Sequence, residues 1–406
     1  MLSLIKKEDC CGCAACMQAC PRQCIKMTFD EEGFQYPKVN VTNCVNCGLC
    51  EKVCPIRQKR YKQELDAQKV YIAYAKNDEI RLHSSSGGIF TLLSESCIKE
   101  NGAVYGAAFT DTFDVCHVGV EKAEDIAKLQ GSKYIQSKVG NTYIEVKERL
   151  KNNQKVVFSG TPCQIAGLKS YLRDDYDNLI TVDILCHGVP SEKLWKKYVA
   201  EQEMAHASRV RRTFFRHKKY GWKKYAVILE FSNNTAYERV FTQDPFMQML
   251  LANISLRPSC YNCRFKEMPH LSDITLGDCW GVQQHSPEMD DNKGTSVVLL
   301  NTAKGKCAFE KILPNLQYKE CSLDCAVSPD AESRQKIRKH PNRKRFFKKL
   351  DEDSIEGLMC YMKTSILTRG VYKVARKLGI DEKQPWNCIE TNKESARKLT
   401  KMTRLE

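Results

Sequence analysis

The sequence predicts a chain of two unlike modules. A small cysteine-rich α+β module at the N-terminus is fused to a larger α/β body, which carries an antiparallel extension and a helical C-terminal tail. Three observations predict this division. Ten of the 22 cysteines lie between residues 10 and 54. Strand-like and helix-like segments alternate from residue 70 onward, which is typical of α/β architecture. The chain of 406 residues is longer than one ordinary hydrophobic core supports.

The α/β body is expected to begin after a polar linker at residues 61–69. Strands are predicted at 70–75, 103–109, 155–160 and 179–186, and helices at 87–101, 142–152 and 163–172. Closely spaced strands between residues 209 and 241 predict the antiparallel extension. We therefore expect an N-terminal module at 1–60, two parts of the body at 70–150 and 151–330, and a basic helical tail at 331–406.

The compartment is expected to be the cytoplasm. Lys6, Lys7, Glu8 and Asp9 interrupt the only candidate leader peptide, and no apolar run approaches the roughly 20 residues of a membrane span. In a cytosolic chain, many cysteines indicate thiolate ligands rather than disulfides. The formal net charge of +15 overstates the charge of a metal-loaded protein, because each 4Fe–4S cluster with its four thiolates carries a net negative charge.

Two copies of one cysteine motif define the N-terminal module. The first reads Cys10-x2-Cys13-x2-Cys16-x3-Cys20-Pro21, and the second reads Cys44-x2-Cys47-x2-Cys50-x3-Cys54-Pro55. This spacing is typical of a bacterial-type ferredoxin with two 4Fe–4S clusters, in which the cysteine before proline binds the other cluster. The expected ligands are Cys10, Cys13, Cys16 and Cys54 for cluster 1, and Cys44, Cys47, Cys50 and Cys20 for cluster 2.

Zinc is the alternative for paired CxxC units, and two complete copies that end in Cys-Pro argue against it. The two surplus cysteines of the module, Cys11 and Cys24, are interpreted as structural thiols.

Five segments of the body carry a family resemblance. They are SSSGGIF at 84–90, GSKYIQS at 131–137, SGTPCQIAGLK at 159–169, DILCHGVPS at 183–191, and CYNCRFKEMPHLSDITLGDCWG at 260–281. In this order they resemble the family of beta subunits of coenzyme F-420 hydrogenases and dehydrogenases, in its bacterial form with a fused ferredoxin. The resemblance implies that the body binds FAD and a third 4Fe–4S cluster. It does not identify the deazaflavin coenzyme as the substrate.

The flavin is expected at turns that precede helices. Gly87 and Gly88 can expose backbone N–H groups at the positive end of a helix, where a pyrophosphate binds well. A plain serine cap followed by a glycine turn is the alternative. Lys133 can supply a cation to a phosphate or to the reduced flavin, or it is a solvated surface lysine. The expected flavin-binding residues are Ser86, Gly87, Gly88, Gly131, Ser132, Lys133, Tyr134, Gln136, Ser137, Gly160, Thr161, Pro162 and Gln164.

Five body cysteines compete for the four positions around the third cluster. The resemblance favours Cys163, Cys186, Cys260 and Cys263, with Cys279 in reserve. Two alternatives remain: Cys163 as a reactive thiol that faces the flavin, and a structural zinc on Cys186, Cys260, Cys263 and Cys279. His187 can ligate metal, move protons or serve as a core residue. No catalytic residue is assigned, and the candidates are Cys163, Lys133 and His187.

These signals predict an iron–sulfur flavoprotein oxidoreductase. Electrons would pass between the ferredoxin-type clusters and an FAD that reduces or oxidises a small organic molecule. The expected protein partner is reduced ferredoxin or another redox protein, and an oligomer is compatible with the sequence. No nucleic-acid motif accompanies the basic segment at 334–350. No Gly-x-Gly-x-x-Gly motif follows a strand, so a Rossmann nicotinamide site is not supported. The alternative is an electron-transfer subunit of a larger complex without its own substrate.

Overall fold

The computed structural model describes residues 6–58 and 68–363. In the N-terminal module, β1 (Ile25–Phe29) and β2 (Gln35–Val39) form an antiparallel hairpin. The two short helices are α1 (Ala15–Gln18) and α2 (Leu49–Lys52). Each begins after a residue in the left-handed region, Ala14 with φ 59° and Gly48 with φ 73°. Both cysteine motifs therefore turn sharply into a helix immediately before their last two cysteines.

The body is built on one mixed sheet of eight strands in the order β13-β3-β12-β11-β7-β6-β4-β5. The strands are β3 (Lys69–Ala75), β4 (Ala103–Phe109), β5 (Val115–Val120), β6 (Val156–Gly160), β7 (Leu179–Ile184), β11 (Ile274–Asp278), β12 (Ser296–Leu300) and β13 (Leu316–Glu320). β4, β6, β7 and β11 are parallel neighbours, whereas β12 is antiparallel to both β11 and β3. β3 therefore runs the same way as β11, and five strands end at one edge of the sheet.

The helices of the body follow the strands closely. They are α3 (Asp78–His83), α4 (Ile89–Lys99), α5 (Ile126–Leu129), α6 (Thr142–Lys151), α7 (Pro162–Leu172), α10 (Val282–His285), α11 (Ala303–Glu310) and α12 (Leu323–Ala326). The helix predicted from Gly87 begins two residues later, because Gly88 has φ 87° and serves as its N-cap. The strands and helices predicted between residues 70 and 186 are present, within two residues at each boundary.

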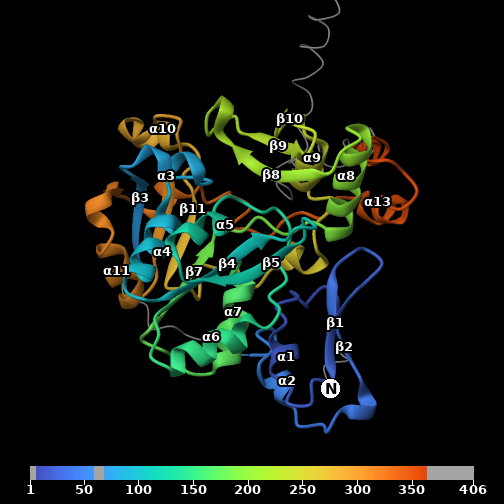
Figure 1. The fold of residues 1–406 in the computed structure, drawn as a ribbon, viewed down its shortest axis with the longest axis horizontal. Helices are drawn as coiled ribbons and strands as arrows, with labels where there is room; N and C mark the ends of the chain where they lie inside the picture. The colour runs from blue at the N-terminus through green and yellow to red at the C-terminus, as the bar shows by residue number, and fades with distance from the viewer. Residues whose placement is uncertain (1–5, 59–67, 364–406) are drawn as a thin grey trace, which may run out of the picture.

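The antiparallel extension is a separate three-stranded sheet in the order β10-β9-β8. Its strands are β8 (Val210–His217), β9 (Ala226–Phe231) and β10 (Ala236–Val240). Helices α8 (Glu192–Ala205), α9 (Pro245–Leu251), α13 (Arg343–Lys349) and α14 (Ile355–Leu358) complete this part of the molecule. Trp195, Phe215 and Phe246 form the centre of its hydrophobic core. Figure 1 shows this layer beyond the carboxyl edge of the main sheet.

Single turns of 3-10 helix connect several elements. They lie at Val41–Asn43, Ala123–Asp125, Lys218–Tyr220, Pro258–Asn262, Pro287–Met289, Leu313–Asn315 and Met359–Met362. Within the described residues, the helices are too short or too polar to cross a bilayer. The part of the predicted basic tail from residue 364 onward lies outside the described residues.

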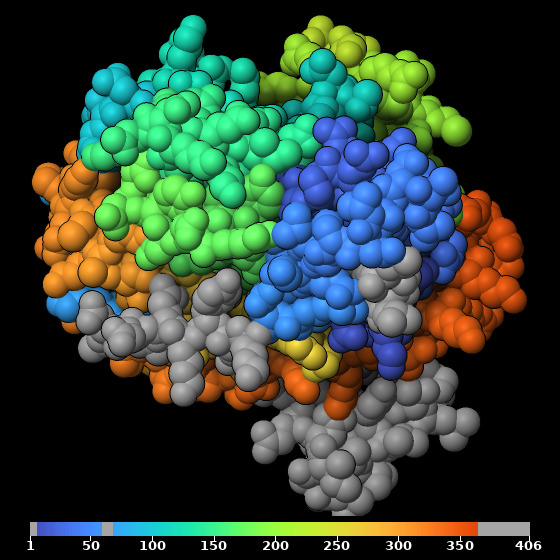
Figure 2. Space-filling model, turned by 90° about the horizontal axis from the view of Figure 1, so that it is seen from below, coloured from blue at the N-terminus to red at the C-terminus, as the bar shows by residue number. Residues whose placement is uncertain are grey.

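The N-terminal module is docked firmly on the body. Figure 2 shows it against α6 and α7 on one side and the C-terminal helices on the other. Arg257, with only 1% of its surface exposed, donates to the carbonyl oxygens of Cys10 at 2.9 Å and Gln35 at 2.8 Å. Arg343 forms a two-point ion pair with Glu32 at 2.8 and 2.6 Å. Arg343 of the basic segment thus contributes to the junction between the two modules, whereas Lys336, Lys339, Lys344, Arg345 and Lys348 are exposed.

Candidate functional site

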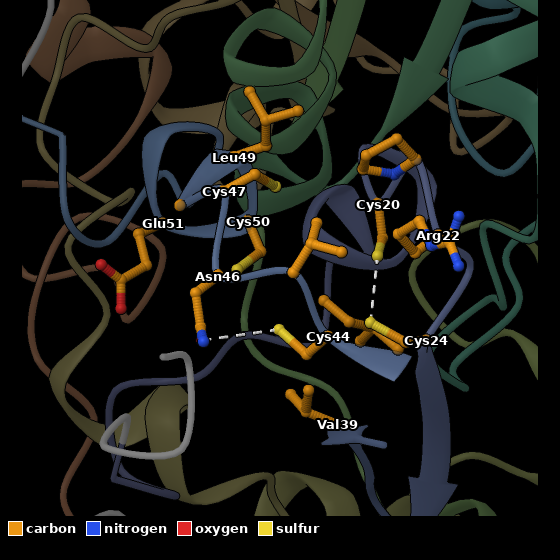
Figure 3. Close-up of a pocket in the computed structure, with 14 residues that line it drawn as sticks. Cys20, Arg22, Cys24, Val39, Cys44, Asn46, Cys47, Leu49, Cys50 and Glu51 are labelled. Atoms are coloured by element: carbon orange, nitrogen blue, oxygen red, sulfur yellow. Dashed lines mark hydrogen bonds between the residues drawn. The ribbon is translucent and has the colours of Figure 1, made fainter. Parts of the chain in front are cut away.

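A pocket opens between the two cysteine motifs of the N-terminal module (Figure 3). Cys20 of the first motif lines it together with Cys44, Cys47 and Cys50 of the second. This is the grouping that the crossed ligand assignment requires for cluster 2; the assignment itself stays a prediction. Cys24, the surplus cysteine, lies with its sulfur 3.4 Å from that of Cys20. A thiol in that position can donate a hydrogen bond to a ligand sulfur, which tunes a cluster's reduction potential.

The four cysteines expected for cluster 1 also interact with one another. Burial together with the neighbouring Cys10 and Cys54 raises the pKa of the Cys16 thiol to about 12. Burial and the same Cys10 raise the pKa of Cys54, although Cys54 belongs to the second motif. Crowded, buried thiols resist ionisation unless positive charge lies among them. The iron of a cluster core supplies such charge, so the donor set fits the group.

A second pocket lies where the module meets the body. Cys163, Cys186, Cys260 and Cys263 all line it, and so does Cys11 from the first ferredoxin motif. These are the four cysteines that the family resemblance favours for the third cluster. Burial and neighbouring cysteines raise the pKa of Cys260 to about 12 and that of Cys263 to about 11. These thiols, like those expected for cluster 1, therefore ionise readily only if positive charge lies among them.

Local structure explains how the first of these cysteines reaches the pocket. Thr161 caps α7 and Pro162 occupies its first turn, as expected for a residue with fixed φ and no N–H. Cys163 follows at the second helical position, with its sulfur 3.1 Å from the hydroxyl oxygen of Thr161. Cys186 comes two residues after β7, the strand next to β6. Adjacent parallel strands thus bring these two cysteines to the same edge.

Cys279 follows β11 at this edge but does not line the pocket. It is buried, at 2% exposure, and its electrostatic neighbours are Cys321 and Cys325. Burial raises the pKa of Cys279 to about 12. The geometry gives no support to Cys279 as the reserve ligand of the third cluster. Which cysteines bind that cluster stays a prediction.

His187 lines the body pocket with both ring nitrogens engaged. Nε2 lies 2.6 Å from the Asn253 side-chain oxygen, and Nδ1 lies 3.0 Å from a carboxylate oxygen of Glu332. Lys266 donates to the carbonyl oxygens of His187 and Glu332. The sequence indicated neither Lys266 nor Glu332, because a lone charged residue has no spacing to mark it. These contacts hold the loop after Cys186 in place.

The residues predicted for flavin binding fall into two groups. The first surrounds the loop before α4. The N–H of Gly87 donates to the hydroxyl oxygen of Ser296 at 2.9 Å, and a Cβ on Gly87 would lie 2.5 Å from the carbonyl oxygen of Ala73. Ser86 donates to the carbonyl oxygen of Thr295 at 3.0 Å. The amide of Gly87 is therefore already satisfied, and this glycine is needed for close packing on β3 and β12.

The turn at 131–134 meets the same loop. Ser132 donates to the hydroxyl oxygen of Ser85 at 2.8 Å. Gly131 is exposed and has φ 77°, and an added Cβ would meet no atom of the described residues within 4 Å. Lys133 donates to the carbonyl oxygens of Gln130 at 2.7 Å and Lys128 at 3.1 Å. Burial lowers the pKa of Lys133 to about 7, whereas the two carbonyl oxygens favour its charged form. Tyr134 packs edge-on against Phe215.

The second group borders the body pocket. Gln136 donates to the carbonyl oxygen of Cys11 at 2.8 Å and accepts from Arg257 at 3.0 Å. Gln164 donates to the carbonyl oxygen of Ser137 at 3.0 Å, and its side-chain oxygen accepts from the N–H of Thr161. Gly160, Thr161 and Pro162 form the turn into α7. Of these residues, Thr161 and Pro162 line the body pocket, and Gln136 contacts the loop that carries Cys11; their assignment to the flavin stays a prediction.

Arg257 is the main residue that sequence reasoning missed. It lines the body pocket, is almost fully buried, and connects the first ferredoxin motif to the segment at Gln136. An isolated arginine before a CxxC pair carries no recognisable pattern. Its role becomes visible only from the three-dimensional contacts.

The two cysteine motifs of the N-terminal module define an iron–sulfur protein. Residues 9–57 match the model of a 4Fe-4S dicluster domain. Residues 70–142 match the N-terminal model, and residues 153–324 the C-terminal model, of the coenzyme F420 hydrogenase/dehydrogenase beta subunit. The chain belongs to this family of beta subunits, which confirms the resemblance drawn from the five segments.

Curated relatives match parts of the chain. A coenzyme F420-dependent sulfite reductase of Methanocaldococcus jannaschii is 30% identical over 180 residues, 41% of this chain and 26% of that protein. A subunit of the F(420)H(2) dehydrogenase of Methanosarcina mazei is 22% identical over 213 residues, 47% of this chain and 58% of that protein. The chain therefore spans about a quarter of the sulfite reductase and somewhat over half of the dehydrogenase subunit. A ferredoxin of Mycolicibacterium smegmatis is 34% identical over 74 residues, 18% of this chain and 65% of that protein.

Among solved structures, a chain of the F420-reducing [NiFe] hydrogenase complex from Methanosarcina barkeri gives a TM-score of 0.44 with 17% identity. The match covers 80% of this chain and 96% of that chain. The family models and the curated relatives place this chain among iron–sulfur electron-transfer proteins related to F420-dependent oxidoreductases.

Proposed function

We propose that this chain relays single electrons between a small-molecule redox site at the carboxyl edge of its main sheet and a partner redox protein. Three 4Fe–4S clusters would carry the electrons, a chemistry that such clusters supply over a wide range of potentials. One observation carries the proposal. Cys11 lines the body pocket, although its sequence neighbours Cys10 and Cys13 are expected ligands of cluster 1. The body pocket and the cluster 1 set are therefore in contact.

The remaining contacts support an order for the relay. A Cβ on Gly167 in α7 would lie 3.0 Å from the sulfur of Cys13, so the helix that begins at Cys163 also touches the cluster 1 set. Cys16 of that set interacts with Cys50 of the second. Cys47, an expected ligand of cluster 2, is exposed. The order of the relay would thus be body pocket, cluster 1 and cluster 2, and a donor such as reduced ferredoxin would dock at cluster 2, so that its electrons run inward to the body pocket.

FAD is the proposed group that exchanges electrons with the small molecule. A bound flavin supplies the link between two-electron organic chemistry and one-electron transfer. The hydrogen bond between Ser132 and Ser85 joins two predicted flavin-binding segments at the carboxyl edge, and this contact supports a site there. Because the amide of Gly87 is used by Ser296, the open turn at Gly131 is the better candidate for cofactor contact.

Anaerobic purification with iron, sulfide, zinc and flavin measured together tests the proposal. About 12 iron and 12 sulfide per chain are expected from three clusters, together with one FAD. A reproducible content near eight iron with stoichiometric zinc would remove the third cluster. Full iron without flavin would remove the flavin alone and leave the relay standing.

The second candidate is an electron-transfer subunit that has no substrate of its own. The names of several relatives favour it, since they describe subunits of dehydrogenases and oxidoreductases. The two functions differ in what the isolated chain can do. Turnover of coenzyme F420, NAD(P)H or another two-electron carrier by the purified chain supports an enzyme. Cluster reduction that requires a co-purifying catalytic polypeptide supports the subunit.

A further inference from the structure

Arg216 in β8 is buried with part of its hydrogen-bonding capacity unused. Only 4% of its side chain is exposed, and Nη1 contacts Asp278 at the end of β11. Nε and Nη2 are also buried, and neither has a hydrogen-bond partner among the described residues. A buried donor without a partner is unfavourable, and more so when it is charged. These two donors therefore call for an acceptor from outside the chain, which an ordered water or a bound ligand can supply.

The two unused atoms define the geometry of that partner. Nε and Nη2 share one edge of the planar guanidinium group, and their N–H bonds along that edge are parallel. This edge matches the two oxygens of a carboxylate or of a phosphate and binds them in a bidentate manner. Asp278 already occupies Nη1, so its carboxylate does not engage this edge; because both atoms are buried, a ligand reaches them only if a neighbouring side chain, such as that of the half-exposed Trp280, moves aside.

Aromatic rings hold the guanidinium in position. Its central carbon lies 4.8 Å from the ring centre of Tyr225 and 5.3 Å from that of Trp280. Trp280 stacks on Trp222 at 4.5 Å, and Trp222 donates to the second oxygen of Asp278 at 3.1 Å. Trp280 is 51% exposed. Arg216 therefore lies beside a ring that reaches solvent, and its carboxylate partner is itself fixed.

Positive charge gathers around this position. Lys218, two residues along the chain, donates to the carbonyl oxygens of Ser86 and Lys293, both at 2.8 Å. Its Nζ contacts carbonyl oxygens rather than a carboxylate in the hydrogen bonds of the described residues. Arg81 is matched by Asp291 in a two-point ion pair. Burial, Arg216 and Arg81 lower the pKa of Lys218 to about 7, so an anion bound beside Arg216 would also favour the charged form of Lys218.

The position also coincides with the proposed redox site. Lys218 contacts the loop that contains Ser86, and Tyr134, from the turn at 131–134, interacts electrostatically with Arg216. Asp278 ends β11, the strand next to β7, which leads to Cys186. On the basis of the proposed function, we propose that Arg216 binds an anionic carboxylate or phosphate group of a molecule held at this site, through its Nε–Nη2 edge.

Calorimetric titration of the protein with sodium acetate, and separately with inorganic phosphate, tests the proposal. The readout is anion binding, so it depends neither on catalytic turnover nor on cluster content. Sodium chloride at matched ionic strength gives the background. Saturable binding of acetate or phosphate is expected for wild-type protein from which flavin has been removed, because a resident cofactor could already fill the edge with one of its phosphates. Arg216→Lys keeps the charge beside Asp278 but loses the parallel donors, so binding should weaken at least tenfold. Arg212→Lys, at an exposed position of the same strand, should bind as the wild type does.

A second variant keeps the test decisive if Arg216→Lys does not fold. Asp278→Asn removes the charge that neutralises Arg216, so it should tighten binding severalfold. Absence of saturable binding by the wild type, or equal binding by Arg216→Lys, would overturn the proposal; so would unchanged or weaker binding by Asp278→Asn. Flavin content identifies the source of the group: retained flavin in Arg216→Lys assigns the anion to the substrate, and lost flavin assigns it to the phosphates of the cofactor.

Discussion

Gly167 in α7 faces Cys13 of the first ferredoxin motif so closely that an added Cβ would lie 2.8 Å from the Cβ of Cys13. The same Cβ would lie 2.9 Å from the hydroxyl of Tyr143. Real Cβ atoms do not approach other atoms this closely, so a side chain here must displace the ligand loop or the helix. The glycine therefore sets the distance between the body helix that carries Cys163 and the cluster 1 set.

Gly167→Ala should displace the loop that carries Cys13. Because Cys13 is an expected ligand of cluster 1, we expect up to about four fewer iron atoms per chain, or a cluster of altered electron paramagnetic resonance spectrum. Lys169→Ala, on the same helix, is the matched control and should keep full iron. Normal iron and an unchanged spectrum in Gly167→Ala would show that α7 does not press on the cluster.

Arg257→Leu should loosen the junction between the modules. It removes hydrogen bonds to the carbonyl oxygens of Cys10 and Gln35 and to Gln136, and leaves buried acceptors without donors. The free energy of unfolding should fall by about 3 kcal/mol or more, measured by denaturant titration. Arg239→Leu, on the exposed edge strand β10, should change it by less than about 0.5 kcal/mol. Similar stability of the two variants would contradict the role of Arg257.

Cys186→Ser should lower iron by about four atoms per chain, because Cys186 lines the body pocket with Cys11 and the three other expected ligands of the third cluster. Cys279→Ser should keep iron unchanged, since Cys279 lies among Cys321 and Cys325 instead. Iron and sulfide analysis of both reconstituted proteins makes the comparison. Loss of iron in Cys279→Ser with full iron in Cys186→Ser would exchange the two assignments.

Gly87→Ala should destabilise the protein even when flavin is absent. The added Cβ would meet the backbone of β3, 2.5 Å from the carbonyl oxygen of Ala73, at a cost of about 1–3 kcal/mol or more. Gly131→Ala meets no atom of the described residues within 4 Å and should cost only about 1 kcal/mol for its positive φ. Thermal unfolding compares the two. If flavin content then falls in Gly131→Ala alone, the cofactor contacts the open turn.

Lowering the pH should reduce the free energy of unfolding through protonation of His117. This buried side chain hydrogen-bonds to the carbonyl oxygen of Ser159 and to Ser137, and burial lowers its pKa from 6.5 to about 4. The unfolded chain therefore binds a proton at a higher pH than the folded chain does. The stabilisation is complete above pH 6.5 and is lost as the pH falls towards 4, with a total of about 3 kcal/mol.

The measurement compares the free energy of unfolding at about pH 7.5 and about pH 5.5 in wild type and in His117→Gln. The wild type should lose about 1 kcal/mol more than the variant over this interval, because only the wild type has His117, whereas the other histidines, including His340 with a pKa that burial lowers to about 4, are present in both proteins. His285→Gln, which removes an exposed histidine, should behave as the wild type does. Parallel pH dependence in wild type and His117→Gln would show that another group dominates.

The sequence predicted the elements that follow simple periodicity. The strands before Cys163 and Cys186 were expected because continuous apolar runs between turn residues are typical of buried parallel strands. The antiparallel strands β12 and β13 were not predicted, although β12 lies between β3 and β11 in the sheet. Strand order depends on long-range pairing, which local patterns do not encode.

The candidate site shows the same difference between what local spacing predicts and what depends on long-range contacts. Spacing alone grouped Cys20 with Cys44, Cys47 and Cys50, and these four line one pocket. The role of Gly87 was inferred from its place before a helix, but Ser296, which takes its amide, comes from a strand 209 residues away. A glycine-rich turn looks the same in sequence whether it approaches a phosphate or the backbone of a neighbouring strand.

The ion pair between Glu32 and Arg343 joins residues 311 positions apart. The first module of the sequence is therefore completed by one of its last described helices. The ferredoxin module and the helix that completes it are therefore far apart in the sequence. A chain emerging from the ribosome holds both ferredoxin motifs long before Arg343 is made. The docked arrangement becomes available only when synthesis has passed that helix. Melting should accordingly be cooperative, with the ferredoxin module and the body losing structure in one transition rather than two.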